Sequence, residues 1–320
     1  MTFLTDLLPR LRLPAIAAPM FIVSSPELVI AQCKAGIVGS MPALNARPPE
    51  LLDEWLGRIG EELATATQAD GRPAAPFAVN LIVHRTNARL DHDLDLCIRH
   101  KVPIVITSLG ARPEVNEALH AYGATVLHDV INPTFARKAI EKGADGLIAV
   151  AAGAGGHAGV ISPFALLAEI RAWFDGPLVL SGAIGTGRGI LAARAAGADL
   201  AYLGSVFIAT QEANAPDDYK ELVVSSGAED IVYTDYFTGV HGNYLRPTIL
   251  AAGLDPDRLN RNTAGMDWNS GSSKPKAWSQ VRGAGQGIGS VGEVLCAGDL
   301  VARLEREYRA AAQGICAGPA

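Results

Sequence analysis

Short apolar runs alternate with longer helix-type segments along the first two thirds of this 320-residue chain, and no other feature constrains its fold as strongly. A strand and helix unit repeated eight times predicts a parallel (β/α)₈ barrel, the TIM barrel of the α/β class. A doubly wound parallel sheet stays open as the alternative, because periodicity cannot show whether the sheet closes. The strand candidates are Ala15–Ala18, Gly36–Gly39, Phe77–Val83, Ile104–Thr107, Thr125–His128, Gly146–Ala151, Leu178–Ser181 and Leu200–Gly204. The helix candidates include Pro26–Ala35, Pro49–Ala66, Ala88–His100, Pro113–Tyr122, Pro133–Gly143, Pro163–Phe174 and Gly187–Ala196.

Proline and glycine mark the expected ends of these helices. A proline fits the first helical turn because its missing N–H would have no helical partner there. Gly143 and Gly197 each stand between a helix candidate and a strand candidate, where a left-handed residue commonly ends a helix. The prolines at helix starts are Pro26, Pro113, Pro133 and Pro163.

The regular alternation ends after about residue 209. Residues 212–284 are rich in Asn, Gly, Ser and Asp, with loop signals at Asn260–Thr263 and Asn269–Ser273, and we expect a lid-like subdomain or insertion there. An amphipathic helix pattern over Val291–Ala312 predicts a helix that packs back on the barrel. The predicted domains are a cofactor-binding barrel over 1–211, an irregular or helical lid over 212–284, and a C-terminal segment over 285–320.

Composition and charge favour a small molecule as the partner. The formal net charge of −6 and the absence of a Lys/Arg-rich run argue against nucleic acid or an anionic membrane surface. No apolar run reaches the length of about 18 residues that a membrane helix needs, and Pro9 and Pro14 interrupt an N-terminus without a basic region. The cysteines are far apart and form no Cys-x-x-Cys pair, so we expect no metal site and a cytoplasmic protein with reduced thiols. They are Cys33, Cys97, Cys296 and Cys316.

The sixth strand candidate leads into a glycine cluster that carries one histidine, His157. In a (β/α)₈ barrel the active site lies at the carboxyl ends of the strands, so this histidine is a candidate catalytic imidazole. The backbone at Gly155 and Gly156 has no Cβ and can approach a flat or anionic ligand closely. The alternative is a histidine that is satisfied by a backbone carbonyl. His128 and Asp129 lie at the carboxyl end of the fifth strand candidate, at the same face of the barrel.

The loops after the seventh and eighth strand candidates predict a phosphate site. Backbone N–H groups in these two loops of a barrel commonly hold a phosphate, and glycines leave such groups accessible. The alternative is that the glycines only form tight turns. The segment Gly153–Ala158 also approximates a dinucleotide-binding fingerprint, but that motif belongs on the first strand of its own unit. The predicted phosphate-binding residues are Gly182, Gly185, Gly187, Gly204 and Ser205, and Ser181 at the end of the seventh strand candidate is a further cofactor-binding candidate.

Six segments in the right order resemble the nitronate monooxygenase family, formerly called 2-nitropropane dioxygenases. The element Ala-Gly-Gly-His-x-Gly is the most specific of them. Three departures occur. Ser181-Gly182-Ala183 stands where the family usually has paired glycines, Ser205 stands where threonine is commoner, and no part of Asn214–Lys276 can be aligned with the family. The segments are Ala18–Met20, Val79–Leu81, Ala154–Gly159, Gly182–Gly185, Gly204–Phe207 and Ala284–Gln286.

This resemblance implies an FMN-binding barrel that oxidises alkyl nitronates with O₂. It implies that His157 abstracts the α-proton when the substrate is a neutral nitroalkane. Met20 and Asn80 would contact the flavin ring, and Gln286 would lie near the flavin. The phosphate would be held by Gly182, Ala183, Gly204 and Ser205. A homodimer stays open.

Two other functions remain as alternatives. The FMN-dependent enoyl-ACP reductases share the Ala-Gly-Gly-His-x-Gly element and the phosphate loops but take hydride from NAD(P)H, so an NAD(P)H-dependent reductase of the enoyl-ACP or quinone type is one alternative. A phosphate-binding barrel without flavin is the other.

Overall fold

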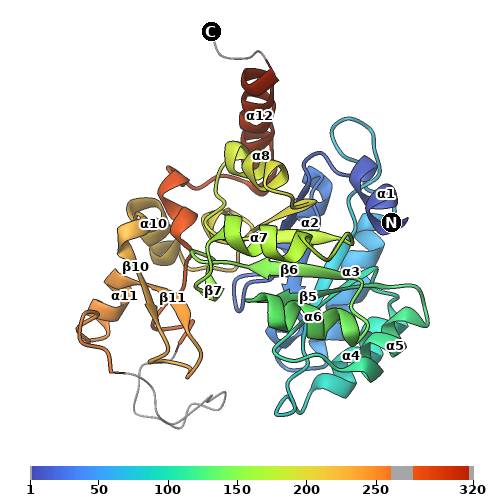
Figure 1. Ribbon diagram of the computed structural model, residues 1–320, viewed down its shortest axis with the longest axis horizontal. Helices are drawn as coiled ribbons and strands as arrows, with labels where there is room; N and C mark the ends of the chain where they lie inside the picture. Colours follow the sequence, from blue (N-terminus) through green and yellow to red (C-terminus); the bar gives the residue numbers. More distant parts are fainter. Residues whose placement is uncertain (1, 261–276, 317–320) are drawn as a thin grey trace.

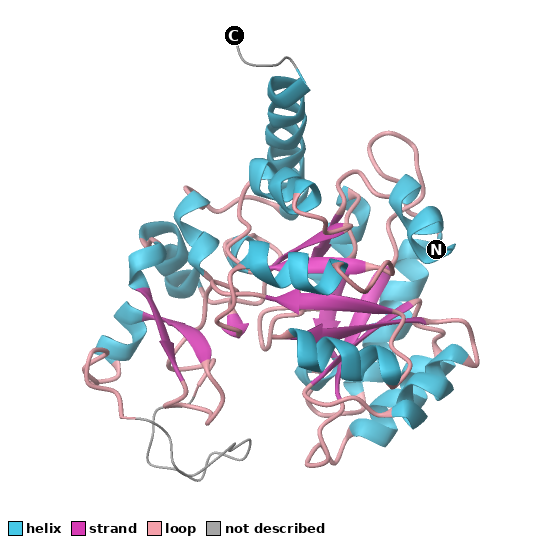
Figure 2. Cartoon of the chain, viewed as in Figure 1, coloured by secondary structure: helices cyan, strands magenta, loops and turns pink. Residues whose placement is uncertain are grey.

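Eight parallel strands curl into a barrel, and the connecting helices lie around it (Figures 1 and 2). The computed structural model describes residues 2–260 and 277–316. The strands lie side by side in the order β1-β9-β8-β6-β5-β4-β3-β2. Ile16 and Val38 form a parallel bridge, and the N–H of Ala17 donates to Val38 O at 2.8 Å, so the two edge strands meet and the barrel closes. The TIM-barrel prediction is confirmed, and the doubly wound alternative is wrong.

The strand bounds follow the apolar runs of the sequence, because both faces of each strand are buried. In β4, Ile104 and Ile106 belong to the cluster that fills the barrel, whereas Val105 belongs to the layer beneath the helices. The strands are β1 (Ala15–Ala17), β2 (Gly39–Pro42), β3 (Phe77–Ile82), β4 (Ile104–Ser108), β5 (Thr125–Val130), β6 (Gly146–Val150), β8 (Leu178–Ser181) and β9 (Leu200–Leu203).

The second strand begins three residues later than predicted. Gly36 adopts a left-handed conformation, with φ of 95°, and ends the preceding helix. A Cβ at this position would lie 2.2 Å from the Gln68 side chain, so the turn is tightly packed. The ladder with β3 therefore starts only at Gly39.

The helix ends predicted from proline and glycine are confirmed. Each of the four prolines lies in the first turn of a helix, and Gly143 and Gly197 follow helices with φ of 90° and 107°. Side chains cap three helices: Ser25, Asn132 and Thr186 each accept a hydrogen bond from a first-turn N–H. The barrel helices are α2 (Pro26–Ala35), α3 (Leu51–Ala64), α4 (Leu90–Arg99), α5 (Pro113–His120), α6 (Pro133–Glu141), α7 (Pro163–Arg171) and α8 (Gly187–Ala195).

The segment after the barrel contains a small antiparallel sheet that the sequence did not predict. Strand β11 (Gly242–Leu245) pairs with β10 (Ile231–Thr234) on one side and with β7 (Gly156–His157) on the other. Figure 1 shows this sheet beside the barrel, next to helices of the same segment. The predicted loops over Asn269–Ser273 and most of Asn260–Thr263 lie outside the described residues. The helices are α9 (Ser205–Ile208), α10 (Asp217–Ser225) and α11 (Arg246–Ala251).

The C-terminal helix α12 (Ala297–Cys316) starts six residues later than predicted. Leu295 pairs with Thr210 in extended conformation, and the Glu212 carboxylate accepts the N–H of Ala297 at 2.9 Å. Helix α12 packs on α8 and α2 through its buried residues, which lie in its first half. Its last turns project from the body of the molecule (Figure 1).

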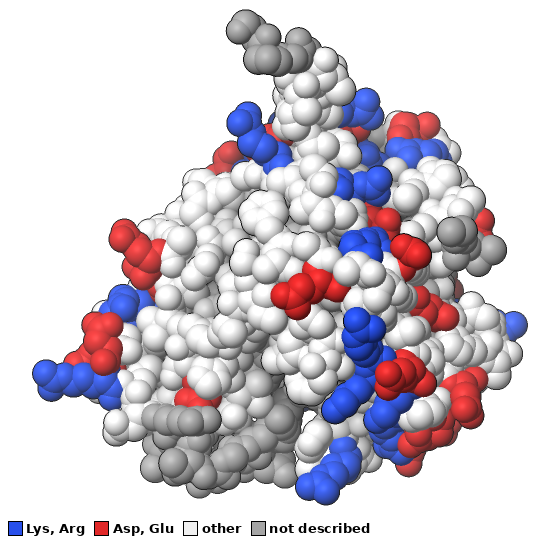
Figure 3. Space-filling model, in the orientation of Figure 1, with Lys and Arg blue, Asp and Glu red and all other residues white. Residues whose placement is uncertain are grey.

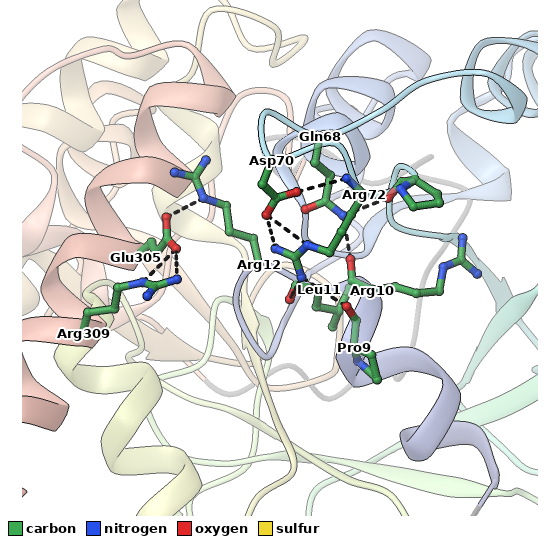
Figure 4. A network of polar contacts seen from close by, with 10 residues as sticks. Pro9, Arg10, Leu11, Arg12, Gln68, Asp70, Arg72, Glu305 and Arg309 are labelled. Atoms are coloured by element: carbon green, nitrogen blue, oxygen red, sulfur yellow. Dashed lines mark hydrogen bonds and ion pairs between the residues drawn. The ribbon is translucent and has the colours of Figure 1, made fainter.

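Polar contacts close the amino-terminal face of the barrel (Figure 4). Arg72 donates to the carbonyl of Leu11 at 2.7 Å and pairs with Asp70, while Gln68 donates to the carbonyl of Arg10. Glu305 of α12 pairs with Arg12 and also with Arg309 of the same helix. In a barrel enzyme this face serves stability. The helices here are α1 (Thr2–Leu7) and η1 (Leu8–Arg10).

Charges are scattered over the face shown in Figure 3, where basic and acidic side chains mix along one side and at one edge. A broad uncharged area lies between them. Among the described helices, none has both the length and the apolar character that crossing a bilayer requires.

Candidate active site

Four loops meet in a small, open recess at the carboxyl ends of β6, β8 and β9. Three of these loops follow the strands, and the fourth comes from residues 285–287, far along the chain. The recess therefore brings together the glycine cluster, both predicted phosphate loops and the neighbours of Gln286. Sequence reasoning missed Tyr202 and Gly287 at this place. The lining residues are Gly153, Ala154, Gly155, Ser181, Gly182, Ala183, Ile184, Tyr202, Gly204, Ser205, Gly285 and Gly287.

Close backbone packing explains why glycine is needed where the loops meet. A Cβ on Gly285 would lie 2.7 Å from Gly153 O and from Gly155 N. The carbonyl of Gly153 accepts the N–H of Gln286 at 2.9 Å and that of Ala183 at 3.2 Å. These contacts hold three of the loops as one shell of backbone.

The recess suits an anion. Among the described residues that line it, none carries a carboxylate, so a phosphate would meet no like charge. Ser205 Oγ accepts the N–H of Gly285 at 2.7 Å, which leaves the Ser205 hydroxyl proton for a ligand. Gly182 and Ala183 adopt positive φ angles of 151° and 52°, and this turn aims the loop at the recess. Backbone donors of this kind bind phosphate groups.

Two of the glycines predicted to bind phosphate do not line the recess. Gly187 packs against α12, because a Cβ there would lie 2.0 Å from Leu304 O, and its N–H donates to the Glu307 carboxylate at 2.7 Å. Gly185 packs against Ser290. Both glycines therefore serve the contact of the barrel with the C-terminal segment.

Met20 lies beside the recess, at the end of β1. A Cβ on Gly204 would be 3.7 Å from Met20 Sδ, so the two loops are in contact. The Asn45 side-chain amide donates to the carbonyls of Met20 and Ser24 at 2.9 and 2.8 Å and holds this loop in place.

Asn80 begins a buried chain of hydrogen bonds across three neighbouring strands. Its Nδ2 donates to Ile106 O at 3.0 Å and to Ser108 Oγ at 2.7 Å, and Ser108 in turn donates to Asp129 Oδ2 at 2.6 Å. A backbone carbonyl only accepts hydrogen bonds, so the atom of the Asn80 amide that faces Ile106 O is the nitrogen Nδ2. Oδ1 of Asn80 is then the atom left to meet a cofactor.

Asp129 and Tyr202 lie inside the barrel near its mouth. Burial raises the pKa of the Asp129 carboxyl group to about 6. Burial, and then the nearby Asp129 charge, raise the pKa of Tyr202 well above its usual value. Because β5 extends through Val130, Asp129 lies within this strand, and His128 points to its other face, where it contacts Thr107.

His157 is held by the small sheet. Its backbone pairs with Gly242 of β11, and its Nε2 lies 3.1 Å from Thr238 Oγ1. The edge of the ring meets Trp278, with ring centres 5.5 Å apart and planes at 85°. Burial lowers the pKa of His157 to about 4, so the imidazole is neutral near pH 7. The amide of Asn243 braces the glycine cluster by donating to Ala154 O at 2.6 Å.

Sequence reasoning missed Thr238, Asn243 and Trp278, the residues that surround His157. They come from the segment without periodic pattern, and nothing in their spacing indicates contact with the glycine cluster. Asp129 was noted only as a strand end, and its link to Asn80 through Ser108 depends on the register of three strands.

Comparison with known proteins shows the family of the chain. The family model described as nitronate monooxygenase matches residues 78–307. A nitronate monooxygenase of Paraburkholderia phytofirmans is 27% identical, with 95% of this chain and 94% of that protein covered. A (3aS,4S,5R,7aS)-5-hydroxy-7a-methyl-1-oxo-octahydro-1H-indene-4-carboxyl-CoA dehydrogenase of Rhodococcus jostii is also 27% identical, with 88% of this chain and 81% of that protein covered.

Solved structures show the same fold. The nitroalkane oxidase of Streptomyces ansochromogenes has a TM-score of 0.76 and 26% identity, with 98% of this chain and 99% of that chain covered. FabK of Thermotoga maritima has a TM-score of 0.77 at 23% identity, with 98% of both chains covered, which shows the fold alone. Because the family model spans well over half of the sequence, the chain belongs to the nitronate monooxygenase family and is a flavin-dependent oxidoreductase.

Proposed function

We propose that this protein binds FMN and oxidises alkyl nitronates and nitroalkanes with O₂. One observation carries the proposal: an anion recess built from backbone lies at the same barrel mouth as Met20 and Asn80, while a neutral histidine adjoins the recess loops through β7. The phosphate of FMN would occupy the recess, near Gly204 and Ser205. Met20 and Asn80 would contact the ring, and Gln286 would lie beside it.

His157 would act as the base toward a neutral nitroalkane. The Thr238 hydroxyl donates its one proton to Val240 O at 3.0 Å, so its oxygen accepts from His157 Nε2. This places the imidazole proton on Nε2, and the neutral imidazole would take the α-proton. Burial makes the imidazole a weak base, but the nitronate formed beside it stabilises the imidazolium.

The flavin, when bound, accepts electrons from the nitronate, with O₂ as co-substrate. The residues of the chain orient the reactants and exclude water. We propose that the described part of residues 212–284 acts as the lid for this purpose, because β11 pairs with β7 and Trp278 contacts one edge of the His157 ring.

Spectroscopy and oxygen consumption test the proposal. The purified protein is expected to show a flavin spectrum, to release FMN on denaturation and to consume O₂ with propyl-2-nitronate and with 2-nitropropane. A colourless protein that gains no flavin on incubation with FMN would contradict it.

An NAD(P)H-dependent reductase is the second candidate, because the dehydrogenase of Rhodococcus jostii, named for a CoA thioester, resembles this chain as strongly as the nitronate monooxygenase. Anaerobic mixing separates the two functions. Bleaching of the flavin by a nitronate but not by NADH or NADPH supports the monooxygenase, and rapid bleaching by either nucleotide supports the reductase.

A further inference from the structure

Two buried polar atoms at the barrel mouth have no hydrogen-bond partner among the described residues: Asp129 Oδ1 and the Tyr202 hydroxyl. Buried polar groups in native proteins are nearly always paired, because an unpaired group loses its contacts with water and gains nothing. The two groups lie close enough for the charge of Asp129 to act on Tyr202. Such a pair points to a ligand that supplies the missing partners.

The surroundings of Asp129 show from which side a partner can come. Its other oxygen, Oδ2, is occupied by the Ser108 hydroxyl. Toward the interior of the barrel lie Ile106, Leu127 and Ile148, which are fully buried and have no polar side-chain atoms. No Lys, Arg or His within residues 2–260 and 277–316 forms an ion pair with Asp129. A partner for Oδ1 therefore has to enter through the open mouth.

Tyr202 connects this place to the anion recess. It lines the recess together with Ser181 and Gly204, while its hydroxyl is buried. Asn80, at the start of the chain that ends on Asp129, lies on β3, across the mouth from β8 and β9. A cofactor with its phosphate in the recess and its ring near Asn80 has to pass over Tyr202 and Asp129.

The chemistry of the two groups selects the part of the ligand that they bind. A carboxylate only accepts hydrogen bonds, so its partner must donate, and a phenol can donate or accept. Resting on the proposed flavin function, we propose that Asp129 Oδ1 and the Tyr202 hydroxyl bind hydroxyl groups of the sugar-alcohol chain that joins the phosphate of FMN to its ring. Asp129 accepts a hydrogen bond from one hydroxyl group of this sugar alcohol. Tyr202 forms a hydrogen bond with the same sugar alcohol, closer to the phosphate.

Affinity measurements test this assignment without reference to activity. The full-length protein is freed of flavin and titrated with FMN, and quenching of FMN fluorescence gives Kd. Asp129→Ala is expected to weaken FMN binding roughly tenfold to a hundredfold, as for the loss of a hydrogen bond to a charged group, and Tyr202→Phe roughly threefold to tenfold. Tyr122→Phe is the matched control, since Tyr122 donates to Val102 O away from the mouth. It should bind FMN like the wild type.

Deoxy analogues locate the contact. The wild type and Asp129→Ala are titrated with 2′-deoxy-, 3′-deoxy- and 4′-deoxy-FMN. One of the analogues is expected to bind both proteins with equal affinity, because it lacks the hydroxyl group that donates a hydrogen bond to Asp129. If Asp129→Ala loses the same factor for all three analogues and for FMN, or binds FMN like the wild type, the assignment is wrong.

Folding and flavin binding are checked separately. Asp129→Asn keeps the shape of the side chain, and its thermal unfolding shows whether a loss of affinity follows from a loss of fold. The wild type alone should also bind the three deoxy analogues with unequal affinities, and this measurement needs no variant. A wild type that binds no FMN would overturn the proposed function itself, whereas FMN binding that is indifferent to Asp129 and Tyr202 overturns only this inference.

Discussion

A histidine that takes a proton from carbon has to be neutral beforehand, and burial achieves this for His157. His157→Asn removes the proposed base and keeps much of the shape. Turnover of neutral 2-nitropropane should fall about 10²-fold or more, the scale of a lost general base, while the pre-formed nitronate should retain most of its activity. Steady-state oxygen consumption with both substrates measures the difference. Equal losses on both would show that His157 binds or positions the substrate instead.

The pH profile follows from the same burial. An unburied histidine loses its basicity as the pH falls below about 6.5, but the pKa of His157 is lowered to about 4. For neutral 2-nitropropane, kcat/KM should therefore stay level as the pH falls through 6.5 and decline only as it approaches 4. The residual activity of His157→Asn provides the reference, because it lacks this ionisation. A wild-type decline centred near 6.5 would contradict the assigned environment.

Thr238 contacts Nε2 of His157 and the Val240 carbonyl, and we expect these contacts to set which ring nitrogen carries the proton. Thr238→Val keeps the shape without the hydroxyl, and kcat for 2-nitropropane should fall about tenfold or more while KM changes little. Thr238→Ser keeps the hydroxyl and should have a kcat close to that of the wild type. Nitrogen NMR of labelled histidine in the wild type should show the Nε2–H form. The prediction fails if Thr238→Ser is as impaired as Thr238→Val.

Turns and strand ends were predictable at the level of elements because their signals are local. Prolines in the first turns and left-handed glycines at the ends of helices act within a few residues. The start of β2 was wrong because Gly36 was assigned to the strand, whereas it ends α2 in a left-handed conformation. The link from Asn80 to Asp129 and the contact of Thr238 with His157 depend on strand register and on an unpatterned segment, so no local signal announces them.

The loop after β9 offers a graded test of the phosphate site. A Cβ on Gly204 would meet Ala18 and Met20 at ordinary contact distances of 3.4 and 3.7 Å, and its φ of −110° suits any residue. Gly204→Ala should therefore retain FMN, whereas the larger Gly204→Val should intrude into the recess and weaken FMN retention during dialysis. Thermal unfolding of the flavin-free proteins should differ little. If Gly204→Val keeps its full flavin content, the phosphate binds elsewhere.

In the molecule as a whole, contacts at the amino-terminal face of the barrel serve stability, and the candidate active site lies at the opposite face. Arg72→Ala removes the contacts of Arg72 with the carbonyls of Pro9 and Leu11 at the amino-terminal face. The free energy of unfolding should fall by about 1 to 3 kcal/mol, while kcat and the Kd of FMN stay unchanged. Denaturant unfolding measures the change, with exposed Arg306→Ala on α12 as the control. A large loss of FMN affinity in Arg72→Ala would show that the two ends are coupled.

The pairing of β7 with β11 also has an evolutionary consequence. The barrel loops would retain the cofactor, whereas residues of the small sheet and its turns set the environment of the base and the space above it. Substitutions around Thr238 and Trp278 can then exchange one substrate for another while the inherited cofactor site stays intact. Relatives with different reactions, dehydrogenase and monooxygenase among them, would then diverge first in this segment and last in the glycine loops.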